Sequence, residues 1–269
     1  MLKQGSALNG FAIEATNGSI GTVSDFLFDD RTWKLRWLVV DTGNWLKDRK
    51  ILLHPSSIDK ADMPARTLLV NLTQSQVENS PGIAIDEPVS NQMESKLFGY
   101  YGVDPLWSNG YYGLNAIARP MSAPALAGGG DTASDAASLR DKGDPHLRSL
   151  NAVSGYNIHA TDGRIGHVET FLFDDLTWDI RYLVVDTRNW WFGKHVLISP
   201  SSVREIVWET NEVSLNLTGY KIKGSPPWDA TGFVDRAYEQ LLVAYYGWPD
   251  HPLPNKQATP AEPIKIPAE

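Results

Sequence analysis

The chain has 269 residues, a hydrophobic fraction of 42% and a formal net charge of −8. This length is enough for about two average domains, and the apolar fraction is enough for each of them to bury a core. The negative charge argues against a nucleic-acid-binding protein, which usually presents a basic face. The absence of cysteine excludes disulfides, thiolate nucleophiles and zinc sites with sulfur ligands.

Short strands dominate the pattern of the first hundred residues. The segment 10–16 is predicted to be a short strand and ends at Asn17-Gly18, a strong hairpin signal. Four further strands are predicted, at 19–30, 35–42, 50–58 and 66–72. Gly21 interrupts the first of these, which indicates a bulge or a close backbone approach. The run 35–42 is apolar and β-branched throughout, so we expect it to be buried on both faces.

Helical spacing follows these strands. Thr73 is a suitable N-cap for a short helix that stops at Ser80-Pro81. A second helix places Met93, Leu97 and Tyr101 four residues apart and ends at Gly102. Its aromatic end, "YYG", predicts either a surface for docking a partner or packing against the unit's own strands.

The same pattern recurs 145 residues later. Between residues 10–58 and 155–203, 27 of 49 positions are identical, and the phrase "FLFDDRTWKLRWLVVDTGNW" returns as "FLFDDLTWDIRYLVVDTRNW". We therefore divide the chain into a first unit at 1–105, a flexible linker at 106–149 that is rich in Ala, Gly, Ser and Pro, a second unit at 150–249 and a proline-rich tail at 250–269.

The repeated residues resemble those of the PRC-barrel family. The resemblance rests on "NGSIGTVSDFLFDDRTWKLRWLVVDT" followed by "KILLHPSSI", and on their second copies. It implies a mainly β fold, with two tandem small β-barrels that are each followed by short C-terminal helices. Relatives with this domain include the cytoplasmic part of the photosynthetic reaction centre H subunit and a ribosome maturation factor. The resemblance implies a protein-docking module without enzymatic activity.

We therefore predict a non-catalytic scaffold that binds protein partners, in an assembly like the reaction centre or with an electron-transfer complex. The alternatives are a factor associated with the ribosome or RNA processing, and a barrel that binds a small ligand. We expect no direct nucleic-acid contact, and the two barrels either pair within one chain or form a homodimer. Since neither a signal peptide nor a membrane-spanning run is visible, the expected location is the cytoplasm, peripheral to the inner membrane through a partner.

The predicted partner-binding residues follow the buried strand of each copy. Short polar groups beside an aromatic side chain suit protein recognition. The alternative is a loop whose polar groups bind local amides while the tryptophan covers the end of the barrel. The residues are Asp41, Asn44 and Trp45 in the first copy and Asp186, Asn189, Trp190 and Trp191 in the second.

Other charged residues of the repeated phrase have structural explanations. Asp29-Asp30 and Asp174-Asp175 lie between two strand patterns, so we expect turns in which Asp accepts backbone amides. Arg36 and its counterpart at 181 are expected to pair with a carboxylate or to face solvent. The histidines lack metal-ligand spacing, although His159 and His167 could meet across a hairpin, so we predict no metal, no cofactor and no catalytic residue.

Overall fold

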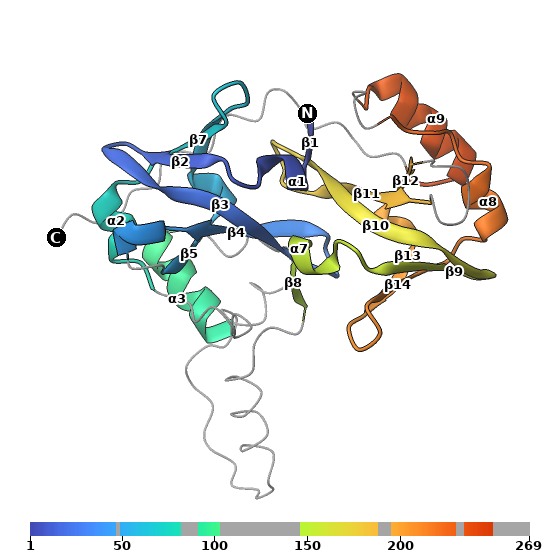
Figure 1. The fold of residues 1–269 in the computed structure, drawn as a ribbon, viewed down its shortest axis with the longest axis horizontal. Helices are drawn as coiled ribbons and strands as arrows, with labels where there is room; N and C mark the ends of the chain where they lie inside the picture. Colours follow the sequence, from blue (N-terminus) through green and yellow to red (C-terminus); the bar gives the residue numbers. More distant parts are fainter. Residues whose placement is uncertain (47–48, 82–90, 103–145, 188–194, 230–233, 250–269) are drawn as a thin grey trace, which may run out of the picture. The chain divides into compact units, whose positions relative to one another are not determined.

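The computed structural model describes residues 1–46, 49–81, 91–102, 146–187, 195–229 and 234–249 (Figure 1). These residues cluster into two compact units, which do not coincide with the two repeats. The C-unit contains Met1–Asn9, Asp25–Leu35 and the described residues from Arg148 onward, and the N-unit contains Gly10–Ser24 and the described residues from Arg36 to Leu147. Strand β3 crosses from the N-unit into the C-unit after Ser24.

The N-unit is built on one sheet with the strand order β5-β4-β3-β2-β7-β6. Strand β2 is antiparallel to β3, β4 to β5 and β6 to β7, whereas β2 and β7 pair in parallel with Ala12 opposite Thr67. Six of the eight residues of β4 are buried, as the apolar run predicted. The strands are β2 (Ala12–Ala15), β3 (Gly18–Asp29), β4 (Lys34–Asp41), β5 (Lys50–Leu53), β6 (Ile58–Asp62) and β7 (Thr67–Val70).

The C-unit repeats this topology with the order β12-β11-β10-β9-β14-β13. All seven residues of β11 are buried, and β14 pairs with β9 in parallel. The strands are β9 (Asn157–Ala160), β10 (Gly163–Asp174), β11 (Ile180–Asp186), β12 (His195–Ile198), β13 (Val203–Val207) and β14 (Glu212–Leu215).

The fold is mainly β, as predicted, but closed tandem barrels are not confirmed. Among the described strands each sheet is an open path, which ends at β5 and β6 in the N-unit and at β12 and β13 in the C-unit. These end strands are joined instead by a single 3-10 turn, η2 (Pro55–Ser57) or η3 (Pro200–Ser202). Proline has no amide hydrogen and a fixed φ, so it bends the chain here. The two end strands of each sheet are therefore connected through this turn and not by a ladder of hydrogen bonds.

Short strands next to each repeat add to the sheets. In the C-unit, β1 (Leu2–Gln4) pairs with β10, with Lys3 opposite Phe173, and α1 (Gly5–Leu8) follows it. β8 (Leu147–Ser149) pairs with β3 and leads into α7 (Leu150–Val153). The composition of the sequence assigns residues 147–149 to the end of the linker. This strand could not be predicted, because three residues are too few to show a periodicity.

Helices follow the strands where the sequence predicted them. They are α2 (Gln74–Glu78) and α3 (Asn91–Tyr101) in the N-unit, and α8 (Gly219–Lys223) and α9 (Arg236–Tyr246) in the C-unit (Figure 1). Thr73 forms a capping box with Gln76, and Gly247 ends α9 at a φ of 77°. None of these described helices has the length and apolar character needed to cross a membrane.

Among the described glycines, a Cβ added at Gly21 or at Gly166 would come closest to another atom. Gly21 has a φ of 144° and Gly166 a φ of 154°. Residues with a side chain rarely adopt such positive φ values, whereas glycine does so readily. A Cβ at Gly21 would lie 2.1 Å from the Asp41 carbonyl oxygen, and one at Gly166 would lie 2.1 Å from that of Asp186. The prediction of a close approach at Gly21 is therefore confirmed.

Replacing Gly21 by alanine tests this constraint. The added methyl overlaps the backbone of the buried strand β4, so Gly21→Ala is expected to lower the free energy of unfolding by at least about 3 kcal/mol. Urea unfolding measures the change. Gly99→Ala is the matched control, because Gly99 lies in α3 with nothing within 4 Å of its added Cβ. Equal stabilities of the two variants would contradict the assignment.

Candidate partner-binding site

The predicted site residues of the first copy lie at the end of β4 and in the turn η1 (Gly43–Leu46). The Asp41 carboxylate accepts a hydrogen bond from the Gly43 amide at 2.9 Å, so it shapes the turn. Asn44 is exposed, and the exposed fraction of Trp45 is 36%. The structure thus presents Asn44 and Trp45 to solvent and uses Asp41 to hold them there.

The second copy is described only in part. Asp186 ends β11 with an exposed fraction of 1%, and its carboxylate lies 3.9 Å from Nε2 of His167. Its carboxylate is therefore away from the surface. Asn189, Trp190 and Trp191 fall in residues 188–194, outside the described residues. The structure places the first set of predicted residues in one turn, and of the second set it describes only Asp186, which is buried.

The Asp-Asp pairs form turns, as predicted. Oδ1 of Asp29 accepts the amides of Arg31 and Thr32 at 2.9 and 3.0 Å. Oδ1 of Asp174 accepts those of the equivalent residues, 176 and 177, at 2.9 and 3.2 Å. The first aspartate of each pair thus binds the backbone of its own turn, while Asp30 pairs with Arg148 and Asp175 pairs with Lys3.

Each turn ends in a tryptophan with a left-handed backbone. Trp33 has a φ of 56° and Trp178 a φ of 61°, an uncommon conformation for a bulky residue. The conformation places the Trp33 ring on Phe28 at a centroid distance of 5.5 Å, and the Trp178 ring on Phe173 at 5.4 Å. Ring stacking of this kind stabilises the turn by about 1 kcal/mol, which offsets the backbone strain.

A buried ion pair joins helix α3 to the sheet of the N-unit. Nη2 of Arg36 lies 2.8 Å from Oε2 of Glu94, and the side chains have exposed fractions of 6% and 3%. The other oxygen of Glu94 accepts the indole N–H of Trp37 at 2.6 Å. Both oxygens of one glutamate in α3 therefore hold two adjacent residues of β4.

The C-unit contains the equivalent arrangement. Nη2 of Arg181 lies 3.2 Å from Oε1 of Glu239, which also accepts the hydroxyl of Tyr182 at 3.3 Å. The prediction that Arg36 and its counterpart pair with carboxylates is confirmed. The glutamates were missed, yet a signal existed, because residues 94 and 239 are both glutamate and are separated by the repeat offset of 145.

The aromatic ends of the helices pack on their own units. Tyr101 and Tyr246, which are repeat counterparts, have exposed fractions of 1% and 6%. Tyr100 donates its hydroxyl to the Gln76 carbonyl at 2.6 Å, and Tyr245 donates to the Lys221 carbonyl at 2.7 Å. Of the two interpretations of "YYG", the structure supports packing within each unit.

Burial of these tyrosines raises the pKa of their hydroxyls. Desolvation raises the pKa of Tyr101, Tyr182 and Tyr246 far above the ordinary value of 10.0, because the phenolate would lose its hydration. Desolvation also raises the pKa of Tyr238 to about 12. These tyrosines stay neutral at physiological pH and serve as packing residues.

Each of three histidines of the second repeat lies near one carboxylate. Nε2 of His159 lies 3.1 Å from Glu212, and Nε2 of His195 lies 3.0 Å from Glu169. His159 and His167 do not pair across the hairpin, since their register partners are Arg164 and Asn157. Within the described ranges, no group of three His, Asp or Glu side chains could hold a metal ion.

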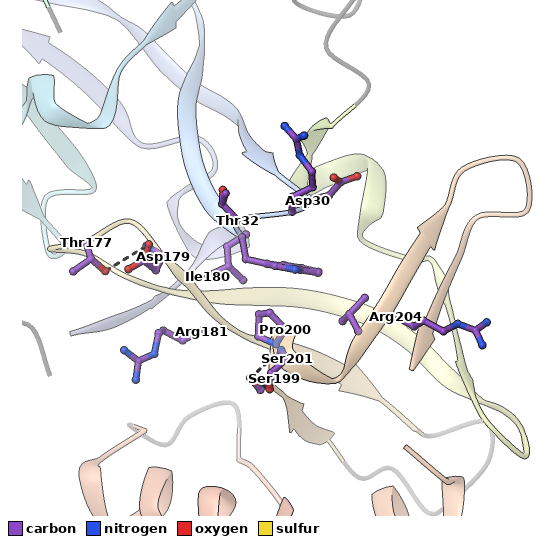
Figure 2. Close-up of a pocket in the computed structure, with 13 residues that line it drawn as sticks. Asp30, Thr32, Thr177, Asp179, Ile180, Arg181, Ser199, Pro200, Ser201 and Arg204 are labelled. Carbon is purple, nitrogen blue, oxygen red and sulfur yellow. Dashed lines mark hydrogen bonds between the residues drawn. The ribbon is translucent and has the colours of Figure 1, made fainter. Parts of the chain in front are cut away.

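A pocket of about 770 Å³ lies in the C-unit beside the first Asp-anchored turn. Figure 2 shows Ile180 and Pro200 near its middle, with Asp30 and Thr32 on one side. The side chains of Arg181 and Arg204 extend in opposite directions (Figure 2). These two guanidinium groups therefore do not converge on one anion.

Residues 4–77 match the family model described as the PRC-barrel domain. The match begins in β1 and ends in α2, so it covers the strands of the first repeat. A search of curated proteins finds no match to the chain.

Removing Glu94 tests the ion pair between α3 and β4. Glu94→Ala leaves the Arg36 guanidinium buried without this carboxylate, so the free energy of unfolding should fall by about 3–5 kcal/mol in urea titrations. Arg204→Ala removes an exposed pair with Glu205 and should cost less than about 0.5 kcal/mol. A loss at Glu94 as small as that at Arg204 would refute the structural role of the pair.

The buried tyrosines predict a stability loss at alkaline pH. Their pKa is higher in the folded state, so their contribution is complete below about pH 10 and is lost as the pH rises further, at about 1.4 kcal/mol per pH unit for each tyrosine. Urea unfolding across this range measures the slope. Tyr101→Phe should make it shallower, and Tyr220→Phe, at a side chain with an exposed fraction of 84%, should not. An unchanged slope in Tyr101→Phe would count against this origin.

Proposed function

We propose that the chain is a non-catalytic scaffold that binds protein partners, because residues 4–77 match the PRC-barrel domain, which suggests a general non-catalytic module. The second repeat, with 27 of 49 positions identical to the first between residues 155 and 203, supplies a second module of the same type. The partner-binding surface of the first module is the turn that carries Asn44 and Trp45.

One observation carries this proposal. The charged residues that the two repeats share have structural partners. Asp29 binds backbone amides, Arg36 is paired with Glu94, and Asp41 holds its own turn. Their counterparts at 174 and 181 do the same in the second repeat. A duplicated active site would instead keep acids or bases oriented toward an accessible space.

The features of the η1 turn suit recognition of a protein. Trp45 has an exposed fraction of 36% on a short turn, and tryptophan is among the residues most enriched at binding hot spots. Asp41 and the Thr42 hydroxyl, which donates to the Arg49 carbonyl at 2.5 Å, hold the base of this loop. An anchored loop loses little conformational entropy when a partner binds.

The partner class follows from charge and from the family. A net charge of −8 favours a protein partner over nucleic acid. The reaction-centre-like or electron-transfer assembly suggested by the family resemblance would place the chain in the cytoplasm, at the periphery of the inner membrane. The inner positions of the N-unit sheet are occupied by fully buried side chains such as Trp37 and Ile51, which supports docking over a ligand held inside the sheet.

Capture from the extract of native cells tests the proposal. The immobilised full chain should retain a protein partner, and Trp45→Ser should reduce its retention by about 30-fold, as expected for the loss of a hot spot. Leu69→Ser is the matched control, because Leu69 has a similar exposed fraction of 38% on β7. Equal retention by both variants would exclude this turn as the site.

Two further outcomes decide between classes of function. Turnover of a small substrate that a single substitution abolishes would show that the non-catalytic assignment is wrong. Retention of the chain in ribosomal fractions of a sucrose gradient would instead identify a ribosome-associated factor.

A further inference from the structure

The C-unit contains contacts between the two repeats that occur in matched pairs. Phe26 packs on Phe173 at 5.7 Å with an interplanar angle of 47°, and Phe28 packs on Phe171 at 5.7 Å and 45°. An offset of 145 converts one pair into the other, since residue 26 corresponds to 171 and residue 28 to 173. The two aromatic contacts are therefore the same contact seen from either repeat.

Backbone and charged contacts follow the same rule. The Leu35 amide donates to the Trp178 carbonyl at 2.8 Å, and the Ile180 amide donates to the Trp33 carbonyl at 2.7 Å. The ion pair of Arg148 with Asp30 has its counterpart in that of Lys3 with Asp175. Contacts that are unchanged when the repeats are exchanged define a local two-fold axis, as in an isologous dimer interface.

A residue that lies on such an axis contacts the equivalent residue of the other repeat. Lys34 forms an antiparallel bridge with Asp179, the residue 145 positions later, and its ammonium lies 3.5 Å from the Asp179 carboxylate. The duplicated position thus holds opposite charges in the two repeats. Two identical repeats in this arrangement would bring together two lysines or two aspartates, and like charges directly opposite on paired strands are destabilising.

A second self-facing position differs in size. Gly5 lies against Leu150, again an offset of 145, and a Cβ built at Gly5 would be only 3.0 Å from Cδ1 of Leu150. A leucine at both positions would overlap, and a glycine at both would leave space unfilled. The two repeats therefore carry opposite charges at positions 34 and 179, and side chains of unequal size at positions 5 and 150. Two identical repeats could be complementary at neither position.

From these contacts we infer that Lys34, Asp179, Gly5 and Leu150 are specificity-determining residues, which let the first repeat pair with the second and prevent pairing of like repeats. The partner that this surface fits is the other repeat of a chain of the same sequence. Pairing of like repeats would join chains end to end, because each chain carries two such surfaces. Pairing of unlike repeats satisfies both surfaces within one chain, where the linker raises their effective concentration.

The test uses the full chain with a protease site inserted between residues 120 and 137, cleaved after folding. The two fragments should remain together, and native mass spectrometry should find complexes of one of each, without pairs of like fragments. Lys34→Asp and Asp179→Lys should each raise the dissociation constant of the fragments by about fivefold, as expected for a partly exposed pair. The combined exchange Lys34→Asp with Asp179→Lys should restore it to within about twofold.

Controls separate this role from general damage to the fold. Lys60→Asp makes the same charge change on β6, at an exposed position outside this contact, and should leave the dissociation constant unchanged. The inference would be overturned if the cleaved chain without further substitutions gave pairs of like fragments in the proportion expected for random pairing. Complete separation of the fragments would overturn it as well. A combined exchange that is no better than either single change would show that the charges at 34 and 179 do not determine the pairing.

Discussion

The structure of each repeat depends on the carboxylate that closes the turn after its longest strand. Asp29 is fully buried and binds two amides, and Asp174 does the same in the second repeat. This turn reverses the chain between a twelve-residue strand and the most buried strand of the sheet. It also holds a tryptophan in a left-handed conformation that covers the adjacent phenylalanine. The turn thereby places Lys34, the next residue, in contact with Asp179, its equivalent in the second repeat.

A second constraint connects helix and sheet. Each sheet places an arginine and an aromatic residue with a polar tip side by side on its buried strand, and a single glutamate from the following helix binds both. Removing charge from water is costly, so this pairing makes the position of the helix specific. The tyrosines at the helix ends, Tyr101 and Tyr246, are buried as well. The helices are therefore integral parts of the units and are not free docking stripes.

Duplication explains which residues have changed and which have not. The aspartates that close the turns and the Arg–Glu pairs that anchor the helices are the same in both copies, because each copy must solve the same folding problem. Positions that meet their own counterpart have diverged to opposite charge and unequal size, as Lys34 and Asp179 show. The loops after the buried strands have also diverged, which is expected where each copy recognises something different.

Much of the fold could be predicted from the sequence, because the signals are local. The hairpin at Asn17-Gly18, the Asp-anchored turns, the buried run that became β4 and the glycine that ends α9 each depend on neighbours in the chain. The candidate site was predictable in part: Asp41, Asn44 and Trp45 share one turn, but their exposure was not, since burial depends on what the rest of the chain covers.

Tertiary structure alone decided the remainder. The pairing of Arg36 with Glu94 joins residues 58 positions apart, and no periodicity links them. The open order of the strands depends on which edges meet, so family resemblance to a barrel did not determine it. The addition of β1 to β10 joins the first residues of the chain to the second repeat. The sequence determined the elements and their turns, because these are short-range interactions; only the folded chain determined which repeat each element completes, because that choice is made by contacts more than a hundred residues apart.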